Sequence, residues 1–246
     1  AIICVSEAAR QSVFAAGIPR DRTEVIYGGC ETPLADPTAR AWAEGQLGIS
    51  SSAPLLVCVG NLLECKGHVP LIEAAGLVRA EIPDAHFVIA GEGVLRSRLE
   101  RRIEQLDLQS HVHLLGFRTD ADRWLSAASV VLHPSLQEGL SLVLIQAQKL
   151  GKLIVSTGVG GSAEVLGLNE AEPCLAWLAA PEDPRSLAEQ IKLATEAWRL
   201  GPDAYAEPLE RAASRARIKF DIDRNVGALI EFAHRLRQSK KGKSLA

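Results

Sequence analysis

Aromatic residues are scarce in this sequence, methionine is missing, and apolar runs are short. Aromatic side chains make up 4% of the 246 residues, although 47% of all residues are hydrophobic. Such a core must consist mainly of Leu, Val, Ile and Ala, which favours a layered α/β fold over an aromatic-rich β-sandwich. The longest apolar stretches, 54–59 and 127–132, are far shorter than the roughly 18 residues that a membrane-spanning helix needs. We therefore expect a globular chain without a membrane span.

A secretory signal is also lacking. Residues 1–6 have neither its basic start nor its small-residue cleavage site, and they resemble a buried strand. The five cysteines form no Cys-x-x-Cys pair and no zinc-binding spacing, and an odd number of them suits a reducing compartment. We therefore expect a cytoplasmic protein. A chain that opens within a strand looks like a piece of a longer protein, although processing or an engineered start would look the same.

Charge is distributed unevenly along the chain. Residues 211–246 contain ten Lys and Arg against three Asp and Glu, so this end carries +7 and residues 1–210 carry −10. An amphipathic run precedes the last basic residues, with apolar side chains at Val226, Leu229, Ile230 and Ala233. Such a stretch could lie on an anionic membrane surface, at the inner face of the membrane. The alternative is a solvated, frayed C-terminus. We expect no nucleic-acid partner.

Short apolar segments alternate with helical patterns over most of the chain. The predicted strands are 1–5, 24–27, 54–59, 86–90, 112–115, 130–132 and 153–156. Repeated alternation of strand and helix indicates parallel βαβ units. After residue 181 only helices are predicted, at 187–198, 203–217 and 222–237. We predict an α/β fold, a doubly wound, Rossmann-like parallel sheet with a C-terminal helical extension.

The loops at the carboxyl ends of parallel strands are candidate sites, because ligands of open α/β sheets bind there. Gly91-Glu92-Gly93 begins like a dinucleotide fingerprint, but Arg96 stands where the third glycine should be, so support for NAD is weak. The loop 60–67 is no Walker motif, because its lysine precedes the glycine. Lys66 of this loop could place a point charge on a phosphate, or it could simply be solvated.

Two further loops add an anion site and two carboxylates. From Gly139 to Ser141, backbone amides would lie at the first turn of an apolar helix, where free N–H groups suit a pyrophosphate. Glu138 would repel a bare phosphate and is better suited to accept hydrogen bonds from sugar hydroxyls. In the glycine turn 158–164, Glu164 could simply be a first-turn helix acid. Together the three loops predict a nucleotide-sugar pocket.

The order and spacing of these motifs resemble a known family. The motifs are Ile89-Ala90-Gly91-Glu92-Gly93, Pro134-Ser135 with Glu138-Gly139, and Gly160-Gly161 with Glu164. They are similar to the C-terminal domain of glycosyltransferase family 4, of the GT-B fold. The opening, from Val5-Ser6-Glu7 through Gly17-Ile18-Pro19 to Val25-Ile26-Tyr27-Gly28-Gly29, looks like the segment that leads from the first domain into the second. The resemblance covers nearly the whole chain.

The resemblance implies transfer of a sugar from a nucleoside-diphosphate sugar to an acceptor, with retention at the anomeric carbon and without a bound metal or cofactor. It divides the chain into a joining segment (1–30), a nucleotide-sugar-binding domain (31–200) and C-terminal helices with a basic tail (201–246). It assigns catalytic roles to Lys66, which would hold the diphosphate, and to Glu138, which would hold sugar hydroxyls. The donor site it implies comprises Gly60, Asn61, Lys66, Gly67, Gly91, Gly93, Glu138, Gly139, Leu140, Ser141 and Gln146.

Two residues depart from the family pattern. Asn61 stands where the family usually has arginine, and Gln146 stands where a second glutamate normally holds the ribose hydroxyls. Donor binding would then be weakened, altered or lost. The family's acceptor site and an important histidine lie in an N-terminal domain that this chain lacks, so we expect half of an enzyme without turnover of its own.

Alternatives stay open for the roles of two histidines and for the function. His133 could be catalytic or simply packed, and His68 could touch a phosphate, whereas His86, His111, His113 and His234 form no recognisable group. The chain could also be a degenerate pseudo-glycosyltransferase that now binds a partner. A related GT-B enzyme, a nucleotide-sugar 2-epimerase, would share the phosphate-binding loops and isomerise its substrate.

Overall fold

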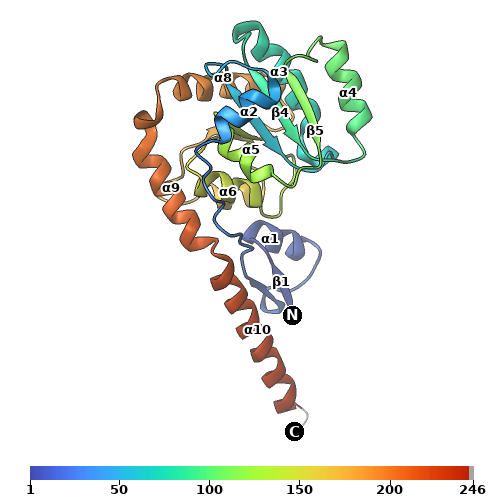
Figure 1. The fold of residues 1–246 in the computed structure, drawn as a ribbon. Helices are drawn as coiled ribbons and strands as arrows, with labels where there is room; N and C mark the ends of the chain where they lie inside the picture. The colour runs from blue at the N-terminus through green and yellow to red at the C-terminus, as the bar shows by residue number, and fades with distance from the viewer. Residues whose placement is uncertain (244–246) are drawn as a thin grey trace.

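A six-stranded parallel sheet forms the centre of the molecule (Figure 1). The computed structural model describes the backbone of residues 1–243 and the side chains of residues 1–238. The strand order is β5-β4-β3-β6-β7-β8, and every neighbouring pair is parallel. Their bounds are Leu55–Val59 (β3), His86–Ala90 (β4), Val112–Gly116 (β5), Val130–His133 (β6), Leu153–Ser156 (β7) and Trp177–Leu178 (β8). The structure confirms the predicted parallel sheet and adds β8, which the sequence pattern does not predict.

Helices cover both faces of the sheet, because successive strand side chains point to opposite apolar layers. Leu56 and Cys58 of β3 face one layer, whereas Leu55 and Val57 face the other. The first layer contains α3 (His68–Glu81), α4 (Arg96–Gln105) and α8 (Pro184–Arg199), and the second contains α2 (Ala39–Leu47), α5 (Ala121–Ala127) and α6 (Leu142–Lys149). This arrangement confirms a doubly wound α/β fold.

The N-terminal segment forms a small sheet of its own. β1 (Ile2–Cys4) pairs in parallel with β2 (Thr23–Val25), and the connection contains α1 (Glu7–Ala15) and the 3-10 helix η1 (Arg20–Arg22). Ser6 caps α1, since its hydroxyl accepts a hydrogen bond from the Ala9 amide at 3.0 Å. The expectation of a buried first strand is wrong in part: within β1 only Cys4 is buried, and Ile3 is 37% exposed.

The C-terminal part is helical, as predicted. α8 leads through the 3-10 helix η3 (Pro202–Tyr205) to α9 (Ala206–Lys219), which packs against α6. α10 (Ile222–Lys243) then runs away from the large sheet and past the N-terminal segment (Figure 1). Within residues 1–243, no helix is both long and apolar enough to span a bilayer.

The predicted amphipathic run lies on α10. Val226 and Leu229 are each 43% exposed and Ile230 is 52% exposed, so this apolar face is open to solvent. The lysines of the basic tail, Lys240, Lys241 and Lys243, lie outside the residues whose side chains the structure describes. Contact of this tail with an anionic membrane therefore stays a prediction.

The segment that leads into the sheet domain and the segment that leaves it meet at Lys149. Lys149, at the end of α6, is 4% exposed, and its Nζ donates to the carbonyl oxygens of Cys30 (2.6 Å) and Phe220 (3.2 Å). Asn225 Nδ2 donates to the Gly28 carbonyl oxygen at 3.2 Å. Because a buried ammonium group requires such acceptors, one lysine joins the segment before α2 to the corner between α9 and α10.

Candidate functional site

The direction of strand addition reverses between β3 and β6. β3 continues to β4 and β5 on one side, whereas β6 continues to β7 and β8 on the other. The loops after β3 and β6 therefore diverge, and ligands of open α/β sheets bind in the crevice at such a point. A cavity of about 260 Å³ lies there. Six of the predicted donor-site residues line it: Gly60, Asn61, Lys66, Glu138, Leu140 and Ser141.

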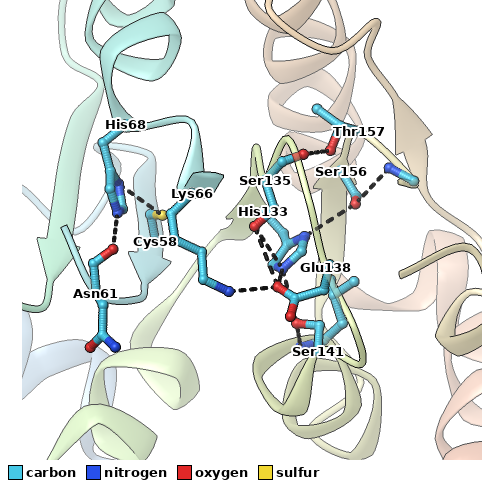
Figure 2. A network of polar contacts seen from close by, with 12 residues as sticks. Cys58, Asn61, Lys66, His68, His133, Ser135, Glu138, Ser141, Ser156 and Thr157 are labelled. Carbon is cyan, nitrogen blue, oxygen red and sulfur yellow. Dashed lines mark hydrogen bonds and ion pairs between the residues drawn. The ribbon is translucent and has the colours of Figure 1, made fainter. Parts of the chain in front are cut away.

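Lys66 and Glu138 meet across this crevice (Figure 2). Lys66 ends the 3-10 helix η2 (Glu64–Lys66), and its Nζ lies 2.7 Å from Glu138 Oε2. Burial alone would raise the pKa of Glu138, but hydrogen bonds from His133 and Lys66 and the charge of Lys66 outweigh it and lower this pKa to about 2. Glu138 is therefore ionised at neutral pH and can only accept hydrogen bonds.

His133 lies at the centre of the polar network in Figure 2, where β6 ends. The residue is 5% exposed. Its Nε2 is 2.9 Å from Ser141 Oγ and 3.3 Å from Glu138 Oε2, and its Nδ1 is 3.5 Å from Ser156 Oγ. Ser135 Oγ is also 3.3 Å from Nε2. The ring is thus both packed and hydrogen-bonded to the carboxylate of the Lys66–Glu138 pair.

The N-terminus of α6 faces the same cavity. Ser141 caps this helix, because its Oγ accepts the Leu144 N–H at 3.2 Å. Leu140, Leu142 and Val143 line the cavity beside it. Free amides of a first helical turn carry partial positive charge. The site therefore combines an ammonium group, a helix N-terminus and an ionised carboxylate.

Close backbone packing holds the loops together at the predicted glycines. An alanine Cβ at position 67 would lie 1.9 Å from the Pro134 carbonyl oxygen, and Gly67 also has φ +69°. A Cβ at position 91 would lie 1.9 Å from the Gly60 carbonyl oxygen, and one at position 93 would lie 2.5 Å from that of Leu62. Gly91 and Gly93 thus pack beneath the loop after β3, outside the residues that line the cavity.

The two residues that depart from the family pattern are placed differently. Asn61 is exposed at the cavity, and its carbonyl oxygen lies 3.0 Å from His68 Nε2. Burial is the main cause that lowers the pKa of His68, so this ring serves the loop as a neutral partner rather than as a cation. Gln146 lies outside the cavity lining, and its Nε2 donates to Asp122 Oδ1 at 2.9 Å.

A second, larger cavity of about 770 Å³ shares Lys66 and Glu138 with the first. Its far wall is α1, through Ala8, Ala9 and Ser12. Its remaining lining residues are Cys65, Leu136, Gln137, Gly139, Val159 and Gly160. Sequence reasoning did not connect α1 with the site, because nothing local in residues 7–15 indicates such a contact.

Glu164 explains how α1 is held there. It lies in α7 (Gly161–Val165), and its carboxylate accepts the amides of Glu7 at 2.9 Å and Ala8 at 2.6 Å. It also accepts the Tyr27 hydroxyl at 3.0 Å. Burial, followed by the hydrogen bond and charge of Glu164, raises the pKa of Tyr27 to about 12. Glu164 is thus more than an acid of its own helix: it caps α1 from a distant part of the chain.

Three histidines gather at the opposite, amino end of the strands, contrary to the expectation that they form no group. The rings of His86 and His111 stack with centroids 5.5 Å apart, and His86 Nδ1 lies 3.3 Å from His113 Nε2. His111 and His113 are two positions apart, which is the only local signal for this pairing. Among the described residues, no group of His, Cys, Asp and Glu is arranged as a metal site.

Comparison with known proteins agrees with this geometry. A family model described as "Glycosyl transferases group 1" matches residues 53–196, more than half of the chain. The chain is 28% identical to the putative glycosyltransferase EpsF of Bacillus subtilis, over 92% of this chain and 57% of that protein. It is 34% identical to the gpi3 subunit of phosphatidylinositol N-acetylglucosaminyltransferase of Schizosaccharomyces pombe, over 67% of this chain and 35% of that protein.

Among solved structures, HepE of Anabaena in complex with UDP and glucose has a similar fold. The TM-score is 0.82 at 24% sequence identity, and the match covers 94% of this chain and 62% of that chain. This chain therefore spans between about one third and two thirds of the length of these proteins. Its parallel sheet is that of the GT-B glycosyltransferases. On the family match and this fold together, the chain belongs to the glycosyl transferases of group 1.

Proposed function

We propose that this chain is the donor-binding half of a retaining, metal-independent glycosyltransferase of the family 4 type. It would take part in transfer of a sugar from a nucleoside-diphosphate sugar to an acceptor. The observation that carries the proposal is the Lys66–Glu138 pair at the reversal point of the sheet, where both residues line two cavities. A protein of similar fold, HepE of Anabaena, has been solved with UDP-glucose, which supports a donor of this class.

In the proposed complex the diphosphate lies between Lys66 and the amides of residues 139–141. A full positive charge and a helix N-terminus would stabilise the diphosphate as it departs from the sugar. The ionised Glu138 would accept hydrogen bonds from sugar hydroxyls on the side of the larger cavity. Lys66 Nζ donates to Glu138 Oε2 in this structure. When the donor binds, the ammonium group would donate to the phosphate as well as to Glu138, or to the phosphate instead.

Residues 1–30 would join this half to a preceding acceptor domain, residues 31–200 would bind the donor, and residues 201–246 would form the helical end. The acceptor site would then lie mostly on the preceding domain. The chain spans 62% of HepE and 57% of EpsF, which leaves room for such a domain. We therefore expect this chain alone to bind the donor without transferring its sugar.

A degenerate binding module is the second candidate, and two side chains favour it. Asn61 gives the cavity a neutral residue where the family pattern has arginine, and Gln146 is engaged by Asp122 rather than facing the cavity. A chain of this kind would bind no nucleotide. Restoring the family pattern with Asn61→Arg and Gln146→Glu would then recover no binding either.

Calorimetric titration with UDP, GDP and ADP in the presence of a chelator tests the proposal. We expect saturable binding of one nucleotide, and we expect Lys66→Ala to weaken it roughly tenfold or more, because a charged hydrogen bond to phosphate is lost. The matched control is Lys192→Ala. Lys192 forms an ion pair of the same length, 2.7 Å, with Glu81, and it is 28% exposed against 27% for Lys66.

Glu138→Ala separates the roles of the two partners. Because Glu138 repels phosphate and would hold the sugar, its removal should weaken a nucleotide sugar more than the corresponding nucleoside diphosphate. Absence of binding by all three nucleotides in a folded chain would count against the donor site and favour the degenerate module.

A further inference from the structure

His133 lies where several polar groups of the site converge, and its hydrogen bonds determine where its proton lies. We infer that His133 is a positioning residue: it carries its proton on Nε2 and thereby commits the Ser141 hydroxyl to donate into the cavity beside α6. The ligand that would receive this bond is the diphosphate, and in that respect alone the inference rests on the proposed function.

Ser156 fixes the proton from one side of the ring. Ser156 is fully buried, and its Oγ accepts the Gly158 N–H at 3.1 Å. His133 Nδ1 lies 3.5 Å from this Oγ, within reach of the hydroxyl proton. A buried hydroxyl proton needs an acceptor, and Nδ1 accepts only when it is unprotonated. The proton of the neutral imidazole therefore lies on Nε2.

Glu138 requires the same tautomer from the other side. His133 Nε2 lies 3.3 Å from Glu138 Oε2, which belongs to an ionised carboxylate that can only accept. A bare Nε2 would set its lone pair against those of the carboxylate. A protonated Nε2 instead shares its one proton between Glu138 Oε2 and the nearer Ser141 Oγ. Ser135 Oγ, also 3.3 Å from Nε2, is then left to donate its own proton to Glu138 Oε2 at 3.5 Å, so both sides of the ring agree.

The consequence for Ser141 follows from its own lone pairs. Ser141 Oγ lies 2.9 Å from His133 Nε2 and 3.2 Å from the Leu144 nitrogen. A serine hydroxyl has two lone pairs and one proton. Because the Nε2–H that Ser141 shares with Glu138 and the Leu144 N–H occupy both lone pairs, the serine proton is left for a third partner, and Ser141 lines the cavity. A ligand beside Ser141 must therefore present an acceptor, as a phosphate oxygen does.

Nitrogen NMR of the 246-residue chain tests the tautomer directly. Long-range proton–nitrogen correlations of labelled histidine distinguish protonated from bare ring nitrogens. Loss of one of the six histidine signals in His133→Gln identifies His133, and the other five show that the variant is folded. At neutral pH we expect a protonated Nε2 and a bare Nδ1. A proton on Nδ1, alone or together with one on Nε2, overturns the inference.

Binding of UDP, GDP and ADP, each compared with its nucleoside, tests the effect on Ser141. In His133→Gln the side-chain amide can place an N–H where Nε2 lies, whereas in His133→Asn it reaches only the position of Nδ1. For the nucleotide that binds, we expect His133→Asn to weaken binding roughly tenfold to a hundredfold and His133→Gln to recover most of it. The nucleoside, which has no phosphate, should not distinguish the two variants.

Two results would contradict the role of His133 in this assay. One is a His133→Asn chain that binds the nucleotide as tightly as the wild type, and the other is an equal loss in both variants for nucleotide and nucleoside alike. If the wild-type chain binds no nucleotide, the proposed function fails, while the NMR spectrum still decides where the His133 proton lies.

Discussion

Glu164→Gln should loosen the N-terminal segment from the sheet domain. The Glu164 carboxylate accepts two amides at the start of α1, those of Glu7 and Ala8, and the hydroxyl of Tyr27. Glutamine keeps the shape of the side chain, but its NH₂ group replaces one acceptor by a donor. At least one of these three donors then loses its partner or faces another donor.

The size of the effect follows from the two interactions that are lost. Removing a negative charge from the positive end of a helix costs about 0.5–1 kcal/mol. Leaving a donor of a charge-assisted hydrogen bond without a partner adds about 1–2 kcal/mol. We expect a total of about 2 kcal/mol, confined to residues 1–27, because the sheet domain has its own core. Opening of α1 would become roughly thirtyfold more frequent.

Amide hydrogen exchange of α1 and titration of Tyr27 measure this change independently. The chain has two tyrosines, so Tyr27→Phe assigns the Tyr27 signal in an ultraviolet titration. Since Glu164 helps to raise the pKa of Tyr27 to about 12, the pKa should fall toward the ordinary 10.0 in Glu164→Gln. Glu189→Gln, at an exposed position of α8, is the control. Unchanged exchange in α1 together with an unchanged Tyr27 titration would refute the role of Glu164.

Two other predictions concern stability. Gly67→Ala should cost more than Gly48→Ala: both glycines have positive φ (+69° and +67°), but only at position 67 would the new Cβ meet a carbonyl oxygen, that of Pro134. We expect about 1 kcal/mol at position 48 and at least twice that at position 67 in urea unfolding, and equal losses would contradict the packing argument. Burial, then His86 and His111, lowers the pKa of His113 to about 4, so the stability present above pH 6.5 is lost as pH falls toward 4. His113→Gln should reduce that loss in urea unfolding at the two pH values, and an unchanged pH dependence would show that the cluster does not titrate in this way.

The sheet domain could be predicted because its strands are buried on both faces, and such strands appear in a sequence as short apolar runs between turn residues. β8 could not, because two residues, Trp177 and Leu178, carry no periodic signal. The burial of the first strand was overestimated for a related reason. An apolar run indicates a strand but does not show whether another element covers it, and Ile3 is partly exposed.

Much of the site was predictable for a topological reason. The carboxyl ends of parallel strands share one edge of a sheet, so Lys66 and Glu138 were expected in one pocket although 72 positions separate them. The bond from Glu164 to the Ala8 amide spans 156 positions and depends on how the N-terminal segment folds back, which no motif encodes. The histidine cluster depends likewise on the register of β4 against β5, which sets Val88 opposite His113.

The contacts of Lys149 affect how the N-terminal segment and α10 can move relative to the sheet domain. Beyond this lysine, Glu24 of the N-terminal segment forms an ion pair with Arg235 of α10, and we call these two parts of the chain the arm. Hydrogen bonds of the Lys149 ammonium and of the Glu164 carboxylate hold the arm against the sheet domain. With 22 residues, α10 is about 33 Å long. If the contacts of Glu164 open while those of Lys149 hold, a rotation of α10 by about 10° about its start moves its far end through about 6 Å.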